Sequence, residues 1–421
     1  MNCGADAAAQ PQDCSEVNLL PSASTNPQTA RKICMERPLK IAIVVPDNRD
    51  EFRAYADPLP HFGTAPTALL DGFSLLPEEC EIHVVNCVQQ PVAVPEKIGP
   101  NIFYHTEIVP KWGWLRGGYL GCIRSVRRQL KKIRPDIVHG QGTERYGALA
   151  AVHSGFPNVL TIHGNMRLIA QLNRDRPFSF NWLAARLESY TLPRTDGVVC
   201  ITHYTQNAVR DLAPRTWVLP NAVNRDFFAV QPAPDPAQPP VILCVGAVCF
   251  RKNQNEFIRA LDALARQKKF RLVFLGQVAN DDYGREFWRI ISERAWCEHQ
   301  PFAAHDQVRE QMRRATVVAL PTREDNCPMV VLEAMAAGVP VLASNVGGVP
   351  DLIEPERTGL FCDPQQPETF AAGVARLLND PELASRLAIA ARQAAQNRFH
   401  PQVIARRHLE IYREVIAARK R

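Results

Sequence analysis

Short runs of apolar, mostly β-branched residues alternate along the chain with longer segments in which apolar residues recur every three or four positions. The first run is LKIAIVVP, beginning at Leu39, and EIHVVNC, PDIVHG, NVLTIHG and DGVVCIT follow it. Helical patterns occupy three of the four intervals between these runs. Buried strands that alternate with helices are typical of a parallel, doubly wound sheet, so the first half of the chain predicts an α/β domain.

A second α/β series begins after a segment rich in proline. Residues 231–240, QPAPDPAQPP, contain five prolines in ten positions and cannot form regular structure. The strand-like runs VILCVG and RLVFLG follow, with helical patterns after them. We therefore predict a first domain over 38–230, a linker over 231–240, a second domain over 241–398 and a final helix over 399–421. Two sheets joined by one linker form a cleft, which is a favoured place for a ligand.

Composition places the chain among soluble globular proteins. It has 421 residues, of which 46% are hydrophobic and 22% charged, enough for two separate cores. Residues 1–37 lack apolar periodicity, which predicts a disordered tail. No apolar run reaches about 18 residues, and the amino terminus does not follow the pattern of a signal peptide. We therefore expect a cytoplasmic protein without a transmembrane helix.

Cysteine usage and net charge add two weaker indications. None of the twelve cysteines forms a close CxxC pair, which favours reduced cytosolic thiols over disulfides or a zinc site. The net charge of +6 is mild and favours acidic substrates or an anionic membrane surface. No nucleic-acid partner and no metal are predicted.

The stretch from Val317 to Ile353 concentrates the candidate chemistry. It reads as a strand, a charged loop, a helix, a second strand and a Gly-Gly turn that leads into another helix. Pro328 suits the start of the first helix and Gly338 its end, so we predict that helix over Pro328 to Ala337. In an open parallel sheet both loops fall at the carboxyl ends of their strands, where such sheets bind ligands.

Two acids of this stretch, Asp325 on the loop and Glu333 in the second helical turn, are placed to flank one ligand. Between them, the free amides of Met329 and Val330 suit a phosphate, aided by the helix dipole. For either acid alone, an ordinary loop acid or a solvated helix residue is the simpler interpretation. The Gly347-Gly348 turn predicts a second anion-suited helix start on the next strand, and the two together favour a site.

Three further positions fall at predicted strand ends or loops. Arg251 and Lys252 follow VILCVG and suit the charge of a diphosphate, although a pair of surface bases ahead of a helix is an equal alternative. His163 ends NVLTIH and faces any ligand held by the second domain, although a lone histidine is more often packed. Gly63 precedes a helical pattern and is a weak candidate for a phosphate or acceptor loop. His139 occupies a similar strand end and receives no role.

The run DNCPMVVLEAMAAGVPVLASNVGGVPDLI resembles the acid, seven residues, Glu signature and the following Gly-Gly loop of the retaining glycosyltransferases of family 4. VLPNAVNRDFF likewise resembles the segment that precedes the interdomain link in that family. The resemblance covers about Leu39 to the carboxyl terminus. This chain differs in having Asp325, preceded by Glu324, where family members usually carry Glu, and Gly246-Ala247 in place of the usual Gly-Arg.

The resemblance implies a GT-B fold, in which two Rossmann-like domains face a cleft and the last helix crosses back to the first domain. It implies a retaining, metal-independent hexosyltransferase without a cofactor. Such an enzyme moves a hexosyl group from a nucleoside-diphosphate sugar to a glycan or lipid-linked acceptor, in the synthesis of cell-surface polysaccharide or glycolipid. The donor would bind the second domain and the acceptor the first.

The resemblance also implies roles for the candidate residues. Glu333 would hold the ribose hydroxyls, and Asp325 would bind hydroxyls of the donor sugar. His163 would contact the donor sugar, so that the catalytic set is His163, Asp325 and Lys252. The groups that would bind the donor are Arg251, Lys252, Asp325, Met329, Val330 and Glu333.

Two rival functions follow from the same sequence. A nicotinamide-dependent oxidoreductase needs a glycine-rich turn after its first strand, and PDNRDEF after Val45 contains no glycine. A catalytically silent sugar-nucleotide-binding or scaffold protein of the same fold is compatible with the Asp325 and Gly246-Ala247 departures. Hydrolysis of sugar nucleotides without an acceptor distinguishes this rival from the enzyme.

Residues 111–134, KWGWLRGGYLGCIRSVRRQLKKIR, combine aromatic and basic residues. An apolar helix face is predicted from Leu120, Ile123, Val126, Leu130 and Ile133, with basic residues over the rest. One interpretation is a crossover helix with a solvated outer face. The other is peripheral binding to the anionic inner face of the membrane. Sedimentation with anionic vesicles, before and after replacing the basic residues by Ser, separates the two.

Overall fold

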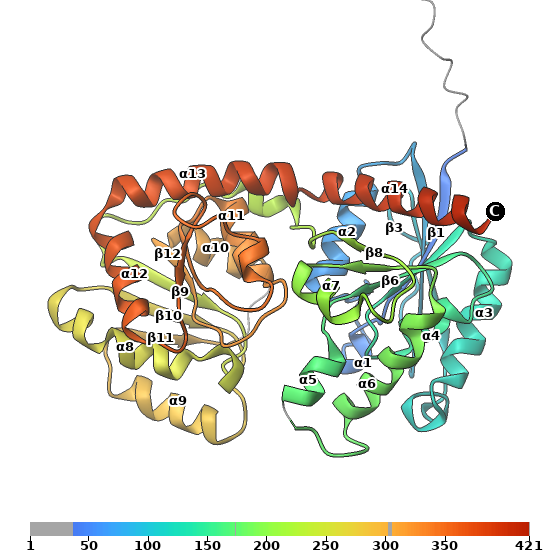
Figure 1. Cartoon of the computed structure of the whole chain (residues 1–421), viewed down its shortest axis with the longest axis horizontal. Coiled ribbons are helices and arrows are strands. Elements are labelled where there is room, and N and C mark those ends of the chain that lie inside the picture. The colour runs from blue at the N-terminus through green and yellow to red at the C-terminus, as the bar shows by residue number, and fades with distance from the viewer. Residues whose placement is uncertain (1–36, 173, 302–304, 421) are drawn as a thin grey trace, which may run out of the picture. The chain divides into compact units, whose positions relative to one another are not determined.

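The computed structural model describes residues 37–172, 174–301 and 305–420. The tail expected over 1–37 lies outside this part of the chain except for Arg37. The described part contains two sheets, each flanked by helices (Figure 1). Within these ranges, no helix is long and apolar enough to cross a membrane.

The first domain is built on an eight-stranded sheet in which all neighbouring strands are parallel except the edge pair β3 and β4. Residues 41 to 44 of β1 pair with both β2 and β5, so β1 lies in the middle of the sheet and its side chains are buried. The strands in spatial order are β3 (Lys97–Gly99), β4 (Ile102–Ile108), β2 (Cys80–Val88), β1 (Leu39–Val44), β5 (Ile137–Gln141), β6 (Asn158–Ile162), β7 (Val198–Cys200) and β8 (Thr216–Val218).

The second domain is built on a six-stranded sheet with parallel neighbours throughout. The strands in spatial order are β11 (Cys297–Gln300), β10 (Arg271–Leu275), β9 (Val241–Val245), β12 (Val317–Leu320), β13 (Val341–Ser344) and β14 (Leu360–Cys362). Strand order therefore reverses between β9 and β12, and the loops after these two strands start side by side at one edge. The predicted α/β class with two doubly wound sheets is confirmed.

Helices connect the strands and cover the sheets. Those of the first domain are α1 (Arg49–Phe52), α2 (Thr64–Ser74), α3 (Leu120–Ile133), α4 (Tyr146–Val152), α5 (Met166–Leu172), α6 (Phe180–Thr191) and α7 (His203–Val209). Those that follow are α8 (Gln254–Gln267), α9 (Asp282–Ser292), α10 (His305–Arg314), α11 (Met329–Ala337), α12 (Glu368–Asn379), α13 (Pro381–Arg398) and α14 (Pro401–Arg419). Short 3₁₀ helices are η1 (Lys111–Gly113), η2 (Leu115–Gly117), η3 (Leu192–Arg194), η4 (Arg225–Ala229), η5 (Phe250–Lys252) and η6 (Val349–Asp351).

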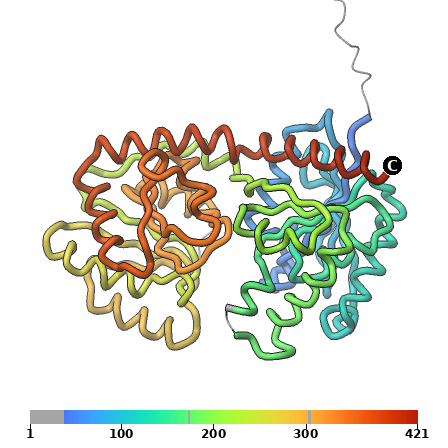
Figure 2. The backbone as a smooth tube through the Cα atoms, viewed as in Figure 1, coloured from blue at the N-terminus to red at the C-terminus, as the bar shows by residue number. Residues whose placement is uncertain are grey.

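The last two helices serve different domains. Helix α13 packs against α11, whereas α14 packs against α2, and Figure 2 shows the red carboxyl-terminal helix beside the blue amino-terminal part of the chain. Tyr412 of α14 is fully buried in the core of the first domain, and its hydroxyl lies 2.6 Å from Nδ1 of His139. His139 is therefore an interior residue of β5 that ties α14 to the sheet.

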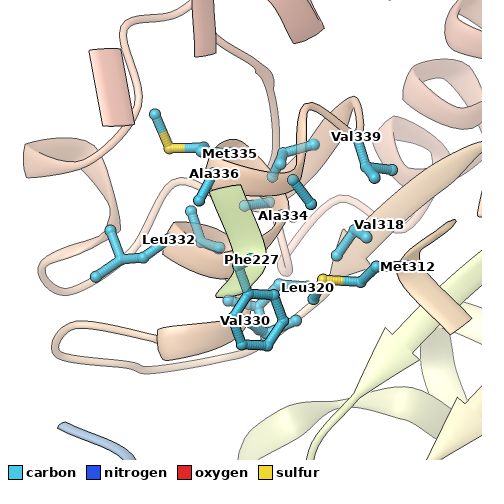
Figure 3. Packing of buried hydrophobic residues seen from close by; sticks show 14 of the residues in the cluster. Phe227, Met312, Val318, Leu320, Val330, Leu332, Ala334, Met335, Ala336 and Val339 are labelled. Carbon is cyan, nitrogen blue, oxygen red and sulfur yellow. The ribbon is translucent and has the colours of Figure 1, made fainter. Parts of the chain in front are cut away.

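The core of the second domain extends into the segment that ends the first. Phe227 of η4 is fully buried against residues of α11, and Figure 3 shows its ring beside Val330. Residues 231–240 form no helix or strand, and the amide of Ala233 donates to the carbonyl of Arg313 at 2.7 Å. The loop before the second sheet is thus attached to α10.

Helix α3 covers β1, β2 and β4 as a crossover helix. Its buried stripe consists of Cys122, Val126, Leu130 and Ile133, whereas Leu120 is 55% exposed. The expectation that Leu120 belongs to the apolar face was wrong, because a stripe advancing by four, four and three residues passes through Cys122 and leaves Leu120 on another side. The basic residues Arg124, Arg127, Arg128, Lys131 and Lys132 are exposed.

Candidate functional site

The loop after β12 and helix α11 form the centre of the predicted site. Helix α11 begins at Met329, with Pro328 as its N-cap, and ends before Gly338, which has a φ of 73°. This left-handed conformation favours glycine, because a side chain would meet the following carbonyl. The helix predicted over Pro328 to Ala337 is confirmed to within one residue.

The turn after β13 differs from the prediction. The helix expected after Gly347-Gly348 is only the three-residue 3₁₀ turn η6. Pro355 limits any continuation of this turn, since it drives Glu354 away from the helical region, and the chain forms a β-bridge between Pro355 and Gly359. The second anion-suited helix start is therefore absent from this turn.

Asp325 lies within a cluster of basic side chains from the turn after β9. Its Oδ2 pairs with Nζ of Lys252, and its Oδ1 lies 3.8 Å from the Arg251 guanidinium. Arg251 also donates to the carbonyl of Glu324 at 3.1 Å. The structure thus brings the predicted cations of η5 to the predicted acid loop across the β9–β12 boundary.

A glycine lies beside the lysine in this cluster at a turn where the backbone conformation, and not a lack of space, favours glycine. Gly246 follows β9 with a φ of 138°, and a Cβ added there would lie 3.9 Å from Cε of Lys252. The lysine stem therefore passes over the turn that ends β9 on its way to Asp325. Its side chain is 15% exposed, compared with 50% for Arg251, so Lys252 is the more enclosed of the two cations.

Glu333 has no comparable partner. It is 6% exposed, and its carboxyl makes no hydrogen bond or ion pair with any residue in the part of the chain that the structure describes. Burial raises the pKa of Glu333 to about 7, because a carboxylate without compensating bonds is disfavoured away from water. The carboxyl is therefore an unused binding group in the second turn of α11.

The amides at the start of α11 are also available. Those of Val331 and Leu332 donate to the carbonyl of Pro328, at 3.1 and 3.5 Å. Among the described residues, none accepts a hydrogen bond from the amides of Met329 or Val330. Free amides at a helix start are suited to an anion.

His163 lies just after β6 and is held by its neighbour on β5. Its Nε2 lies 2.7 Å from Oε1 of Gln141, and burial lowers the pKa of His163 to about 4. An amide oxygen only accepts, so Nε2 carries the proton and Nδ1 is left as an acceptor. His163 is therefore a neutral, oriented imidazole at neutral pH.

A cavity of about 450 Å³ brings several of these residues together. Asp325, Met329, His163 and Gly63 all line it, whereas Glu333, Val330 and the two cations do not. Gly63 is the N-cap of α2, with an ordinary φ of −61°. The remaining lining residues are Val45, Pro46, Asn48, Glu51, Thr64, Ala65, Pro66, Gln141, Glu144, Arg145, Phe180, Ile201, Asn221, Asn326 and Cys327.

The first-domain wall of this cavity contains polar residues that the sequence reasoning missed. Arg145 pairs with Glu51 at 2.8 Å, and Oε2 of Glu144 is buried with no hydrogen-bond partner in the described chain. Burial raises the pKa of Glu144. Glu144 and Arg145 lie on the loop after β5, which ends at Gln141. The rule that ligand sites gather at the carboxyl ends of parallel strands, which selected His163, would therefore also have found them. The predicted strand run PDIVHG ends at Gly140, one residue before the end of β5 at Gln141.

Within the described ranges, no group of three or more His, Cys, Asp or Glu side chains is arranged to hold a metal ion. All nine cysteines in the same ranges are free, and seven of them are buried.

Comparisons with known proteins agree with this architecture. Residues 74–227 match the family described as Glycosyltransferase Family 4, and residues 228–394 match the one described as Glycosyl transferases group 1. A glycogen synthase of Mycobacterium tuberculosis is 27% identical over 296 residues, which are 66% of this chain and 69% of that protein. A GDP-mannose-dependent alpha-(1-6)-phosphatidylinositol monomannoside mannosyltransferase of the same species is 27% identical over 53% of this chain and 63% of its own.

Solved structures show the same fold. Sucrose-phosphate synthase from Thermosynechococcus elongatus superimposes with a TM-score of 0.73 at 21% identity, over 90% of this chain and all of that one. Anabaena HepE in complex with UDP-glucose superimposes with a TM-score of 0.66 at 17% identity, over 89% of this chain and all of that one. The two family matches adjoin and together cover residues 74–394, and the two parallel-stranded sheets agree with the solved structures. The chain therefore belongs to glycosyltransferase family 4, has the GT-B fold, and is an enzyme that transfers sugar from a nucleotide-sugar donor.

Proposed function

We propose that the protein is a retaining, metal-independent hexosyltransferase that uses a nucleoside-diphosphate hexose. The main support for this proposal is that the carboxyl of Glu333 is buried and has no hydrogen-bond or ion-pair partner in the described chain. Its two oxygens suit the two hydroxyls of a ribose, and a ligand that supplies those donors offsets the cost of burying the carboxylate. We assign Glu333 to ribose binding on this ground.

Lys252, Arg251 and the amides of Met329 and Val330 would receive the diphosphate. Without a ligand, Lys252 neutralises Asp325. A diphosphate carries more negative charge than one carboxylate and would therefore compete for Lys252. Asp325 would then be free to accept hydrogen bonds from hydroxyls of the donor sugar. The cations would stabilise the charge that develops on the leaving diphosphate.

The acceptor would lie against the first-domain wall of the cavity, near Glu144 and the Glu51–Arg145 pair. Its hydroxyl oxygen would attack the anomeric carbon on the face from which the diphosphate leaves, and its proton would pass to the departing phosphate oxygen. This front-side transfer needs no protein nucleophile. The neutral imidazole of His163 would contact the donor sugar through Nδ1.

The acceptor class is proposed as a glycan or a lipid-linked sugar in the synthesis of cell-surface polysaccharide or glycolipid. The names of the two relatives, a glycogen synthase and a phosphatidylinositol monomannoside mannosyltransferase, support a hexosyl donor and include one acceptor of each kind. Peripheral binding of the exposed basic face of α3 to an anionic membrane would suit the lipid-linked alternative. Trp112 in η1, which is 72% exposed, lies close to α3 in sequence and supports that placement.

The test is a panel of sugar nucleotides that includes UDP-glucose and GDP-mannose. We expect at least one to raise the thermal unfolding midpoint, and the same one to be hydrolysed slowly when no acceptor is present. Release of the hexose with its anomeric configuration retained would support the mechanism. Binding without turnover would favour the silent sugar-nucleotide-binding protein, and neither binding nor turnover would favour a scaffold.

A further inference from the structure

Asn326, the residue after Asp325, reaches from the acid loop of the second domain into the first. Its Oδ1 accepts hydrogen bonds from the hydroxyls of Thr202 at 2.5 Å and Thr205 at 2.7 Å. Its Nδ2 donates to the main-chain carbonyl of His163 at 3.1 Å. The side chain is 9% exposed, and three of its four hydrogen-bonding positions are used by the first domain.

The chemistry of these partners requires an amide at this position. Thr202 is the N-cap of α7 and accepts the Thr205 amide at 3.3 Å, so its hydroxyl proton is free to go to Asn326. The carbonyl of His163 only accepts, so it needs a donor. A carboxylate could accept hydrogen bonds from the two threonine hydroxyls but could not donate one to the carbonyl of His163. An aliphatic side chain could form none of these hydrogen bonds.

Asn326 also fixes the acid that precedes it. Its main-chain amide donates to Oδ1 of Asp325 at 3.1 Å. One residue therefore contacts the carboxylate of Asp325 through its backbone and the backbone of His163 through its side chain. These are the two proposed catalytic residues that come from different domains.

The Gly347-Gly348 turn closes around the same contact. A Cβ on Gly348 would lie 2.1 Å from the carbonyl oxygen of Asn326 and 2.6 Å from Cγ2 of Thr202, and one on Gly347 would lie 2.0 Å from the carbonyl oxygen of Asp325. Side chains cannot be accommodated at these distances. The two glycines therefore allow the loop after β13 to pack against the acid loop and the start of α7.

A second bond links the same two regions. The carboxylate of Asp351 in η6 accepts the main-chain amide of His203 in α7 at 2.5 Å. The start of α7 is thus held by the loops after both β12 and β13. These polar contacts between the domains lie beside the proposed reacting groups.

We propose that Asn326 is a positioning residue that sets the placement of Asp325 relative to His163 by tying the acid loop to the end of β6 and the start of α7. It touches neither donor nor acceptor in this role. Binding of the nucleotide part of the donor by Glu333 and Lys252 takes place within the second domain and does not depend on the tie. Sugar transfer needs both domains and does depend on it. The kinetic part of this inference rests on the proposed function, whereas the structural part does not.

The experiment compares Asn326→Ala with a Thr202→Val, Thr205→Val double variant, which removes both hydroxyl donors without changing the acid loop. Thr202→Ser, Thr205→Ser keeps the hydroxyls and is the matched control. Small-angle X-ray scattering of the full chain reports the relative placement of the domains without any substrate. We expect the radius of gyration to increase in both disrupting variants and to stay at the wild-type value in the control.

Kinetics on the sugar nucleotide that the wild type hydrolyses supply the second measurement. We expect kcat to fall at least about tenfold in both disrupting variants while the donor KM stays within about threefold, because misplacing one reacting group slows the step without weakening donor binding. Unchanged scattering together with unchanged kcat would overturn the proposal. The proposal would also be overturned if kcat and the donor KM changed equally in the disrupting variants and the serine control showed the same changes. If no sugar nucleotide is turned over, the proposed function fails, and scattering alone decides whether the tie exists.

Discussion

The two acids of the acid loop and helix α11 lie eight residues apart in opposite electrostatic surroundings. Asp325 is neutralised by Lys252 and has Arg251 nearby. Glu333 is buried among apolar residues of α11 and has no partner in the described chain. The loop acid is therefore stabilised by cations of the protein itself, whereas the helix acid has no such partner among the described residues and gains from a proton or from a ligand that donates hydrogen bonds. Similar residues at a fixed spacing thus hold different roles: one organises the cations, and the other is a vacant binding group.

The largest predicted effect is the loss of folding stability that follows from ionising the unpaired carboxyl of Glu333. The pKa of Glu333 is raised from 4.5 to about 7, so the folded state holds the proton more tightly than the unfolded state. The associated stability is fully present below pH 4.5 and is lost as pH rises through about 7. The wild type should therefore lose on the order of 3 kcal/mol over this window relative to Glu333→Gln, which has no ionisable group.

Urea unfolding of both proteins at pH 5 and pH 8 measures this difference. Parallel changes in the free energy of unfolding of the two proteins would show that Glu333 is not held as a strained, unpaired carboxyl. A smaller loss in wild type with a saturating sugar nucleotide would indicate that ligand hydroxyls relieve the same cost.

A slightly smaller effect is expected from the opposite member of the comparison. Lys252→Ala removes the enclosed cation and leaves Asp325 with the half-exposed Arg251 guanidinium at 3.8 Å and the main-chain amide of Asn326. We expect kcat/KM for sugar-nucleotide hydrolysis to fall on the order of 100-fold, as it does when one donor to a developing charge is removed. Arg251→Ala is the matched control and should cost less than about tenfold, because half-exposed ion pairs contribute little. Equal losses in the two variants would contradict the distinction between them.

Local sequence signals account well for the framework of the site. Alternating apolar runs predicted both parallel sheets, because a buried strand needs apolar residues on both faces. Pro328 and Gly338 located helix α11 to within one residue, because each has a conformational preference that few other residues share. The strand-end rule also placed Arg251, Lys252 and Asp325 at one edge, and the structure brings these three together.

Signals that depend on distant partners were missed. Asn326 is an ordinary loop residue in the sequence, and its hydrogen-bond partners lie more than 120 residues away. The prediction of a helix after Gly347-Gly348 was wrong because a Gly-Gly turn followed by Pro350 indicates where a helix can start but not how far it continues. Leu120 was assigned to the apolar face because it lies three residues before Ile123. The buried stripe instead runs through Cys122, Val126, Leu130 and Ile133, which leaves Leu120 exposed.

The central claim is that Glu333 binds the ribose of the donor. The most direct test is calorimetric titration of the intact sugar nucleotide that the wild type can hydrolyse into the wild type and into Glu333→Ala. A hydrogen-bonded charged group contributes about 1.5–3 kcal/mol, so the variant should bind the donor at least about tenfold more weakly. Unfolding at pH 8 supplies the control for folding, because the variant should be no less stable there than the wild type. Donor affinity that is unchanged in Glu333→Ala would contradict the assignment of Glu333 to the ribose and with it the proposed donor site.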